Sequence, residues 1–571
     1  MHKRILSLLL LLATVFSIFT LASCGEREKT PVATTTATKI GSGSDDATAG
    51  EETTAGTDKW EALAPKVTMI AARDRTLKIE YENYVNAEHA AKNDVYLEGP
   101  DAIEEGVTPK IRQLVYERNK AACELFGLTI EYEPWHLYYG QQGPKIQEVV
   151  QAKAADAPDL FVDMIYDLNN VLLTVGAFKD VWSIPGGFFD FNEKGWLTTW
   201  MENMSLTTDR AYILGSDYFL DLMCAITVLP FNLTMMDANA AKLSGAIIGA
   251  DDDPLGTGEN LSTRFFDLVD QGGWTWEVLG LLSEAIWEDT DGDGADSIRD
   301  RLGIIADEYG GVNAASFIYS CGEELTERYK IEDPADPNNG KWWIKYADTS
   351  AGLNKIFDAV KAVFDGSGSL STNSGNHNGN TPENPGTAYH HTKFAAGETL
   401  FAGVCTLGAL EDEVFQQMTE IYSVVPCPKA DADNEYNTII VNQGDAGAIN
   451  VNSNPRKTRA LSAYIQYCTE NSPAIRHEFL ETVTKYKTTT YNQGTDRMLD
   501  IIYDGILYGR DKAIDDLVNI SRWHSMMKSQ HFQAGSDYIV SEYEAARGNK
   551  QKKLDEIIDK WYSLPTVEAG E

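Results

Sequence analysis

The chain has 571 residues and a strongly acidic composition, with 48 lysine and arginine residues against 86 aspartate and glutamate residues. Its formal net charge of −38 at pH 7 argues against nucleic acid or an anionic lipid surface as the partner. The length predicts roughly two to four domains with large cores. With so many acids, a chance pair of carboxylates does not identify a glycosidase.

The N-terminus has the order of a lipoprotein signal. A charged start precedes an apolar run from Ile5 to Ala22, and Leu21–Cys24 reads LASC. This order predicts a signal peptide over 1–23, with Cys24 as the lipidated first residue of the mature chain. A transmembrane anchor is the alternative, which serine and threonine within the run disfavour. We expect a lipid-anchored protein on the outer face of the cytoplasmic membrane.

The next segment, 24–66, is predicted to be a disordered tether. As far as about Asp58 it consists mainly of Thr, Ala, Gly, Ser and Glu without aromatic residues, so it cannot bury enough surface to fold.

Folded structure is predicted to begin with a strand, a helix and a second strand. Thr76–Glu82 alternates like a strand, Ile111–Phe126 has helical spacing and ends at Gly127, and Leu128–Glu133 alternates again. Such a unit is expected to be parallel and right-handed.

A third strand is predicted at Pro158–Val162, after a helix that ends by Ala157. Asp163 and Tyr166 follow it closely. Ligands of open α/β sheets bind outside the carboxyl ends of the strands, so these two residues are candidates for ligand contact.

A short amphipathic helix is predicted after Gly272 and Gly273. Its apolar face consists of Val278, Leu279, Leu282, Ala285 and Ile286.

An acid loop with the spacing of a twelve-residue calcium site follows that helix. Asp289, Asp291 and Asp293 alternate, Gly294 permits a sharp turn, and Asp300 stands at the twelfth position. We predict a structural calcium ion bound by the ligands Asp289, Asp291, Asp293, the Ala295 carbonyl and Asp300. The alternative is a solvated acidic turn.

Other metal and enzyme patterns are weak. His377, His390 and His391 fall in the stretch Gly366–His391, which is predicted to be a solvated loop. His477–Glu481 lacks the second histidine of a zinc peptidase motif, and no nucleophile elbow or phosphate-binding loop is present. Six cysteines beyond Cys24 lack zinc spacing, and disulfides and free thiols are both open.

Several motifs together resemble one protein family. The run WTWEVLGLLSEAI followed by DTDGDGADSIRDRLGI resembles a segment of the lipoprotein solute-binding proteins of bacterial ABC importers, the extracellular solute-binding family 1. The Arg118-Asn119 pair before LTIEYE, the strand at Pro158, Phe394–Phe401 and Ile421–Lys429 also resemble its motifs. The resemblance spans nearly the whole mature chain.

The resemblance implies a fold and its division into domains. The expected fold is α/β with two hinge-linked lobes, similar to the type II periplasmic-binding-protein fold, with the ligand cleft between the lobes. Lobe one is expected over 67–228 with 430–475, and lobe two over 232–420 with 490–565.

The resemblance also implies a function. The chain is expected to be a non-enzymatic receptor that captures a solute, most simply a carbohydrate or oligosaccharide, closes its lobes over it and delivers it to an ABC permease. Val404–Gly408 read VCTLG and lack the family's aromatic residue, so a peptide or other solute remains an alternative, as does an extracellular carbohydrate-active enzyme. The candidate ligand contacts are Trp135, Asp163, Tyr166, Tyr319 and Trp523.

Overall fold

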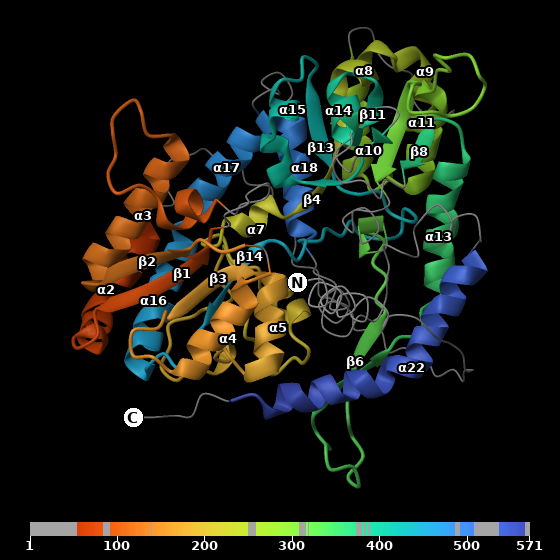
Figure 1. Cartoon of the computed structure of the whole chain (residues 1–571). Coiled ribbons are helices and arrows are strands. Elements are labelled where there is room, and N and C mark those ends of the chain that lie inside the picture. Colours follow the sequence, from red (N-terminus) through yellow and green to blue (C-terminus); the bar gives the residue numbers. More distant parts are fainter. Residues whose placement is uncertain are drawn as a thin grey trace, which may run out of the picture.

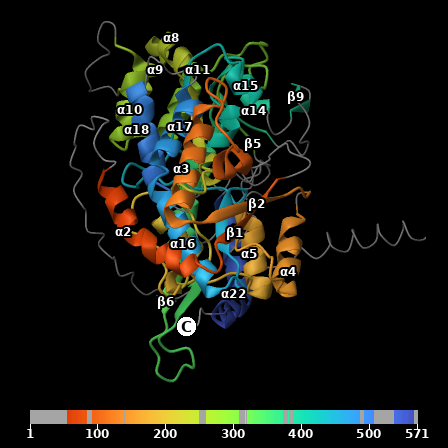
Figure 2. The same cartoon turned by 90° about the vertical axis from the view of Figure 1, so that its left-hand side faces the viewer.

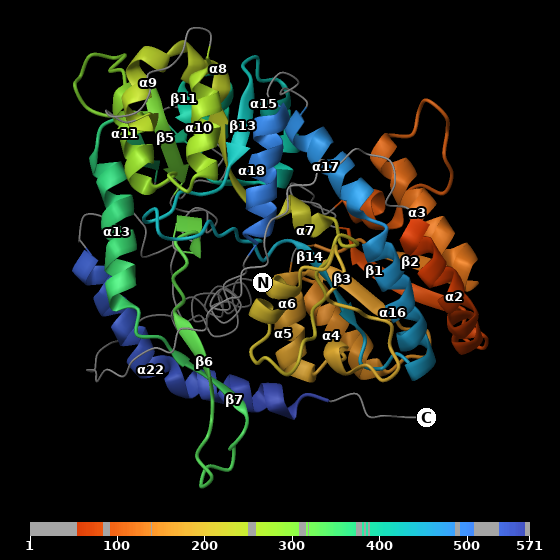
Figure 3. The same cartoon turned by 180° about the vertical axis from the view of Figure 1, so that it is seen from behind.

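The chain forms two α/β lobes and a long C-terminal helix that runs past both of them (Figures 1 and 3). The computed structural model describes residues 54–83, 92–138, 140–248, 259–307, 316–317, 319–372, 380–381, 384–385, 389–485, 492–506 and 536–565. Among the helices in these ranges, none is both long enough and apolar enough to cross a membrane. The predicted two-lobed α/β fold class is confirmed.

The first lobe contains a four-stranded sheet in the order β14-β3-β1-β2. Its strands are β1 (Thr76–Glu82), β2 (Thr129–Trp135), β3 (Leu160–Met164) and β14 (Asp445–Ile449). β1 pairs in parallel with β2 and β3, whereas β14 is antiparallel to β3. The three predicted strands are therefore present, and a distant segment completes the sheet.

Helices cover both faces of this sheet. Figure 2 shows α2, α3 and α16 on one face and α4 and α5 on the other. The elements are α2 (Thr54–Ala71), the π-helix η1 (Asp94–Glu98), α3 (Lys110–Phe126), α4 (Gln142–Ala152), α5 (Ile165–Val175), α6 (Thr198–Met204), α7 (Asp221–Cys224) and α16 (Pro455–Glu470). Gly127 ends α3 in the left-handed conformation, with φ of 63°, as its position predicted.

The prediction of a disordered tether over 24–66 is wrong from residue 54 onward, where α2 begins. Trp60 is 1% exposed, and its ring meets Phe126 and Tyr467 edge-on at centroid distances of 5.5 and 5.9 Å. Its Nε1–H donates to the Glu470 carboxylate at 2.6 Å. The burial of this face of α2 against α16 and α3 supplies the stabilisation that a tether lacks. Cys24 and the signal peptide lie outside the described residues.

The second lobe contains a mixed sheet in the order β12-β4-β11-β5-β8, with β13 also paired to β4. The strands are β4 (Thr227–Asn232), β5 (Leu302–Asp307), β8 (Ser369–Thr372), β11 (Thr399–Phe401), β12 (Cys405–Thr406) and β13 (Tyr422–Val425). The helices are α8 (Leu233–Ala238), α9 (Ala240–Ile247), α10 (Leu261–Asp270), α11 (Trp276–Ile286), α13 (Ser350–Asp365), α14 (Tyr389–Ala395), the 3₁₀ helix η3 (Leu407–Glu411), α15 (Glu413–Gln416) and α18 (Asn492–Asp504).

The predicted amphipathic helix is α11, and it packs tightly on β5. Leu279, Leu282 and Ile286 are fully buried, and the Thr275 side chain caps the first turn. A Cβ added to Gly303 would lie 2.2 Å from the Ser283 Cα, so only glycine permits this approach of strand and helix. This close contact explains the glycine that follows the acid loop.

The chain passes between the lobes at β4, after β13, and between α17 (Pro473–Lys485) and α18. After β13, Lys429 exchanges backbone hydrogen bonds with Trp274 and Trp276 at 3.2 and 3.0 Å. α17 packs on α3 of the first lobe, and α18 packs on β13 and α10 of the second.

The structure shows the state of the cysteines and the environment of two histidines. All six cysteines in the described residues are free, and Cys321, Cys405, Cys427 and Cys468 are buried. The prediction of a solvated loop over Gly366–His391 is wrong near both ends. Ser369–Thr372 form strand β8, and His390 is buried in α14 with its ring centroid 4.0 Å from that of His391. Burial holds the pKa of His391 well below its usual value, so its imidazole is neutral. His377 lies outside the described residues.

Candidate functional site

Five acidic side chains meet at one edge of the first sheet. β1 and β3 are parallel and end at this edge, where the antiparallel β14 begins. The carboxyl cluster consists of Glu80, Glu82, Asp163, Asp221 and Asp445, all between 0 and 7% exposed. In open α/β sheets this edge is where ligands bind.

Hydrogen bonds fix part of the cluster. The Asn93 side-chain amide donates to Asp445 at 2.5 Å, and the Asp445 backbone N–H donates to Asp221 at 3.2 Å. Asp163 accepts from the Met164 N–H at 2.8 Å. Among the described residues, neither carboxyl oxygen of Glu80 has a hydrogen-bond partner.

Burial and mutual repulsion favour protonation of the cluster. Desolvation, followed by the charges of Asp163, Glu82 and Glu133, holds the pKa of Glu80 well above its usual value. The pKa values of Asp163 and Asp445 are also strongly raised, and burial raises the pKa of Asp221 to about 6. A protonated carboxyl both donates and accepts a hydrogen bond, which is the requirement for recognition of a hydroxyl group.

The lysine near the cluster is engaged across the lobe boundary. Lys92 forms an ion pair with Glu411 of η3 in the second lobe, and the Tyr96 hydroxyl donates to the same carboxylate at 3.1 Å. A cavity of about 300 Å³ lies beside these residues and is also lined by Arg112 and Phe479. The two lobes therefore touch through polar side chains next to the cluster.

The sequence-predicted contacts of the first lobe have different environments. Trp135 ends β2 and is 8% exposed, and its ring packs against Phe161 at 6.1 Å, so it belongs to the core. Asp163 lies within β3, not beyond it, and belongs to the carboxyl cluster. Tyr166 stands in the first turn of α5 with 38% of its surface exposed.

The contacts predicted in the second lobe do not complete a site. Tyr319 is 5% exposed and lies beside Ser320, whose hydroxyl donates to the Pro428 carbonyl of the crossover at 3.2 Å. Trp523 lies outside the described residues. The structure thus brings Asp163 together with four acids that the sequence did not single out.

One sequence signal for those acids was available. Glu80 and Glu82 alternate with apolar residues along β1, yet both are buried. Two acidic residues at the carboxyl end of a strand, beside a strand that is otherwise apolar, indicate the ligand-binding edge of a sheet. No local sequence pattern identifies Asp221 and Asp445 as members of the carboxyl cluster.

The acid loop forms a separate site in the second lobe. Ligand atoms of Asp289, Asp291 and Asp293 all lie within 4.8 Å of one another. Backbone N–H groups of Gly292 and Gly294 donate to Asp289, and the Ala295 N–H donates to Asp293 at 2.8 Å. These turns aim the carboxylates at one point, and this donor set fits a hard cation such as Ca²⁺.

Asp300 has a different role from the one its spacing predicts. It stands outside that group of three, and its two oxygens accept the backbone N–H groups of Thr290 and Ser297 at 2.9 and 2.7 Å. Although burial opposes it, these bonds hold the pKa of Asp300 below its usual value. Asp300 therefore ties the two ends of the loop together.

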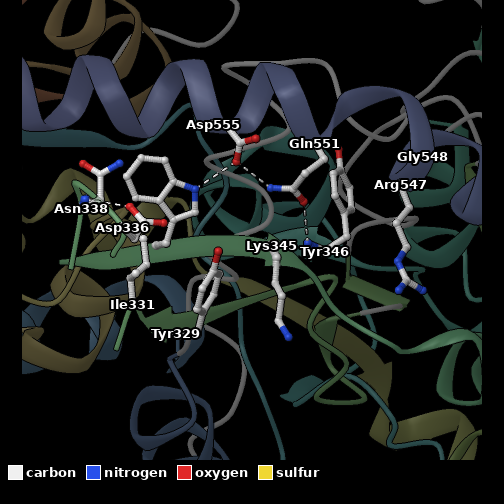
Figure 4. A pocket seen from close by; sticks show the side chains of 11 residues that line it. Tyr329, Ile331, Asp336, Asn338, Lys345, Tyr346, Arg547, Gly548, Gln551 and Asp555 are labelled. Carbon is white, nitrogen blue, oxygen red and sulfur yellow. Dashed lines mark hydrogen bonds between the residues drawn. The ribbon is translucent and has the colours of Figure 1, made fainter. Parts of the chain in front are cut away.

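A second cavity lies away from both sites. It has a volume of about 810 Å³ and lies between a hairpin, β6 (Thr326–Lys330) and β7 (Trp342–Tyr346), and the helix α22 (Ser536–Ser563). Figure 4 shows Tyr329 and Lys345 beside it, and Trp343 donates to Asp555 across its wall at 3.0 Å. The tryptophan of this cavity, Trp343, is buried in its wall, so the indole ring is not free to stack on a ligand.

Comparisons with known proteins give similarity at the level of structure. The sequence matches no protein-family model and no curated protein. The GacH receptor of Streptomyces glaucescens, solved unliganded and with acarbose, is 12% identical with a TM-score of 0.45, over 85% of this chain and 99% of that chain. The sugar-binding protein MalE of Xanthomonas citri is 10% identical with a TM-score of 0.46, over 86% and 100%.

A further similar structure is the galacto-N-biose and lacto-N-biose I-binding protein of an ABC transporter from Bifidobacterium longum, solved with lacto-N-biose. It is 12% identical with a TM-score of 0.45, over 84% of this chain and 98% of that chain.

Proposed function

We propose that the protein is the substrate-binding lipoprotein of an ABC transporter, and that it captures a carbohydrate and delivers it to a membrane permease. The observation that carries the proposal is the carboxyl cluster at the strand edge of lobe one, in a chain whose two lobes are joined by several crossovers. Sugar-binding proteins of ABC transporters have structures similar to this one, which supports the proposal.

The cluster suits a hydroxyl-rich solute. Protonated carboxyls donate and accept hydrogen bonds, whereas the exposed ring of Tyr166 offers an apolar face near the same strand end. The alternatives are a peptide or other non-sugar solute and an extracellular carbohydrate-active enzyme.

A thermal-shift screen tests the function. Purified protein is incubated with maltotriose, lacto-N-biose, acarbose, short peptides and spermidine. A solute at about 100 times its Kd stabilises the folded state by about 2.7 kcal/mol. We expect a rise in Tm with at least one saccharide and none with peptides or spermidine. Chromatography of the saccharide afterwards separates the alternatives, because a consumed saccharide favours an enzyme.

We predict that calcium raises the melting temperature through Asp289, Asp291 and Asp293. For a Kd about ten times below the calcium concentration, the stabilisation is about 1.4 kcal/mol. The double variant Asp291→Ala and Asp293→Ala should lose this calcium-dependent shift in differential scanning calorimetry. The matched control removes two acids from the β6–β7 turn, Asp333→Ala and Asp336→Ala, and should keep it. No shift of the unmodified protein at millimolar calcium would refute the metal site.

Anchoring is tested at Cys24. Cys24→Ser removes the thiol that would carry the lipid, so we expect the chain to move from the membrane fraction to the soluble or secreted fraction. Fractionation and mass measurement of the N-terminal peptide check this. A membrane-bound Cys24→Ser variant would contradict the lipoprotein assignment.

A further inference from the structure

The hairpin β6–β7 and α22 form one rigid unit, which we call the strap. The Tyr543 hydroxyl donates to the carbonyls of Leu325 and Ala347, at 2.7 and 2.8 Å, which lie together at the open end of the hairpin. Further along α22, the Gln551 side chain accepts from the Tyr346 backbone N–H at 3.3 Å (Figure 4). It also donates to the Ile344 carbonyl at 3.1 Å. α22 also packs along α13, so the strap belongs to the second lobe.

The C-terminal end of the strap docks on the first lobe. Trp561 is 3% exposed, and its Nε1–H donates to the buried Thr207 hydroxyl at 2.7 Å. The ring meets Tyr212 edge-on at 4.9 Å. Arg210 donates to the carbonyls of Trp561 and Leu564 at 3.4 and 3.5 Å. Trp561 is therefore an anchored aromatic with its polar group satisfied.

Two more contacts join the strap to the same lobe. Arg328 of β6 donates to the carbonyls of Glu202 and Ser205 at the end of α6. Pro565 lies against Gly176, where an added Cβ would be 3.0 Å from its Cδ. The hairpin and α22 therefore contact lobe one at separate points.

The strap joins the two lobes on the side opposite the crossovers. α22 crosses from lobe two to lobe one on the side away from α17 and α18, where the chain crosses over (Figures 1 and 3). Rotation about the crossovers moves this far side most, and a helix of 28 residues is a stiff rod about 42 Å long. A docked rod on the moving side resists any change in lobe separation.

We propose that the strap holds the two lobes at a fixed separation, and that undocking of the Trp561 end is the step that frees them to rotate. The hinge closure expected of a solute receptor then requires this end to release lobe one. This role of the strap does not depend on which solute is bound, so it can be tested without a ligand.

The test compares unliganded wild type with the double variant Trp561→Ala and Arg328→Met. Hydrogen exchange of amides in 205–212 should accelerate about tenfold or more, and small-angle scattering should show a broader distribution of interatomic distances. Thr207→Val removes only the hydrogen-bond acceptor and should give a smaller acceleration in the same segment. Lys560→Ala changes an exposed side chain in the same turn and should match wild type.

The near-ultraviolet circular dichroism spectrum and a single thermal transition establish that each variant is folded. A folded double variant with wild-type scattering and wild-type exchange would overturn the proposal, because the lobes would then keep their separation without the strap. If the double variant unfolds, wild-type exchange in Thr207→Val would overturn it equally.

Discussion

Replacing Trp60 with alanine is expected to lower the free energy of unfolding by about 3–5 kcal/mol, the usual cost of removing a buried tryptophan. Trp60 is 1% exposed between Phe126 and Tyr467. The substitution also leaves Glu470 without the indole donor at 2.6 Å. Trp60→Phe keeps part of the packing and should lie between wild type and alanine.

Urea unfolding followed by circular dichroism measures these differences. Lys59→Ala is the matched control, because its ion pairs with Glu193 and Glu470 are partly exposed and worth about 0–1 kcal/mol. A second comparison uses chains that begin at residue 54 and at residue 67. If residues 54–66 only linked the domain to the membrane, both Trp60→Ala and the shorter chain would be as stable as the full mature protein.

Helix α2 could have been predicted from the spacing of its apolar residues. Trp60, Ala64, Val67 and Ala71 recur with helical spacing and are the buried positions. The composition before Asp58 and the proline inside the helix, Pro65, point the other way. Propensity is a weak guide here because packing of α2 on α16 overrides it.

Local patterns predicted the strands of lobe one well. β1 has the predicted bounds Thr76–Glu82, since its alternation of apolar and polar residues reflects the pleat directly. The carboxyl cluster depends on long-range pairing instead. Asp445 reaches Asp163 only because β14 adds to β3 from far down the chain, and no spacing in the sequence records that pairing.

The stability of the protein is expected to depend on pH through the buried carboxyl group of Glu80. Its pKa is well above the usual 4.5 in the folded protein, chiefly because burial penalises the charge, and the nearby Asp163, Glu82 and Glu133 add repulsion. Between these two pKa values the folded protein holds a proton that the unfolded chain has released. The stability contributed by Glu80 is therefore complete below pH 4.5 and is lost as the pH rises through the folded pKa.

Glu80→Gln removes this titration while it keeps the shape of the side chain. For one such group the pH-dependent loss is at most about 1.4 kcal/mol for each pH unit. We expect the Tm of Glu80→Gln relative to wild type to rise steadily between pH 5 and 8. The control Glu131→Gln changes the same charge on the neighbouring strand, where the side chain is 55% exposed, and should show a nearly constant difference.

Differential scanning calorimetry in matched buffers at pH 5, 6, 7 and 8 provides the measurement. Asp445 is also fully buried, and Asp163 and Glu82 repel both Asp445 and Glu80. Asp445→Asn should therefore show the same upward trend, and coupling through these shared acids should make the double variant gain less than the sum of the two. Identical pH profiles for Glu80→Gln and Glu131→Gln would mean that the Glu80 carboxyl is ionised in the fold. The cluster would then need a bound cation or solvent to compensate its charge, and hydroxyl recognition by protonated acids at this edge would lose its physical basis.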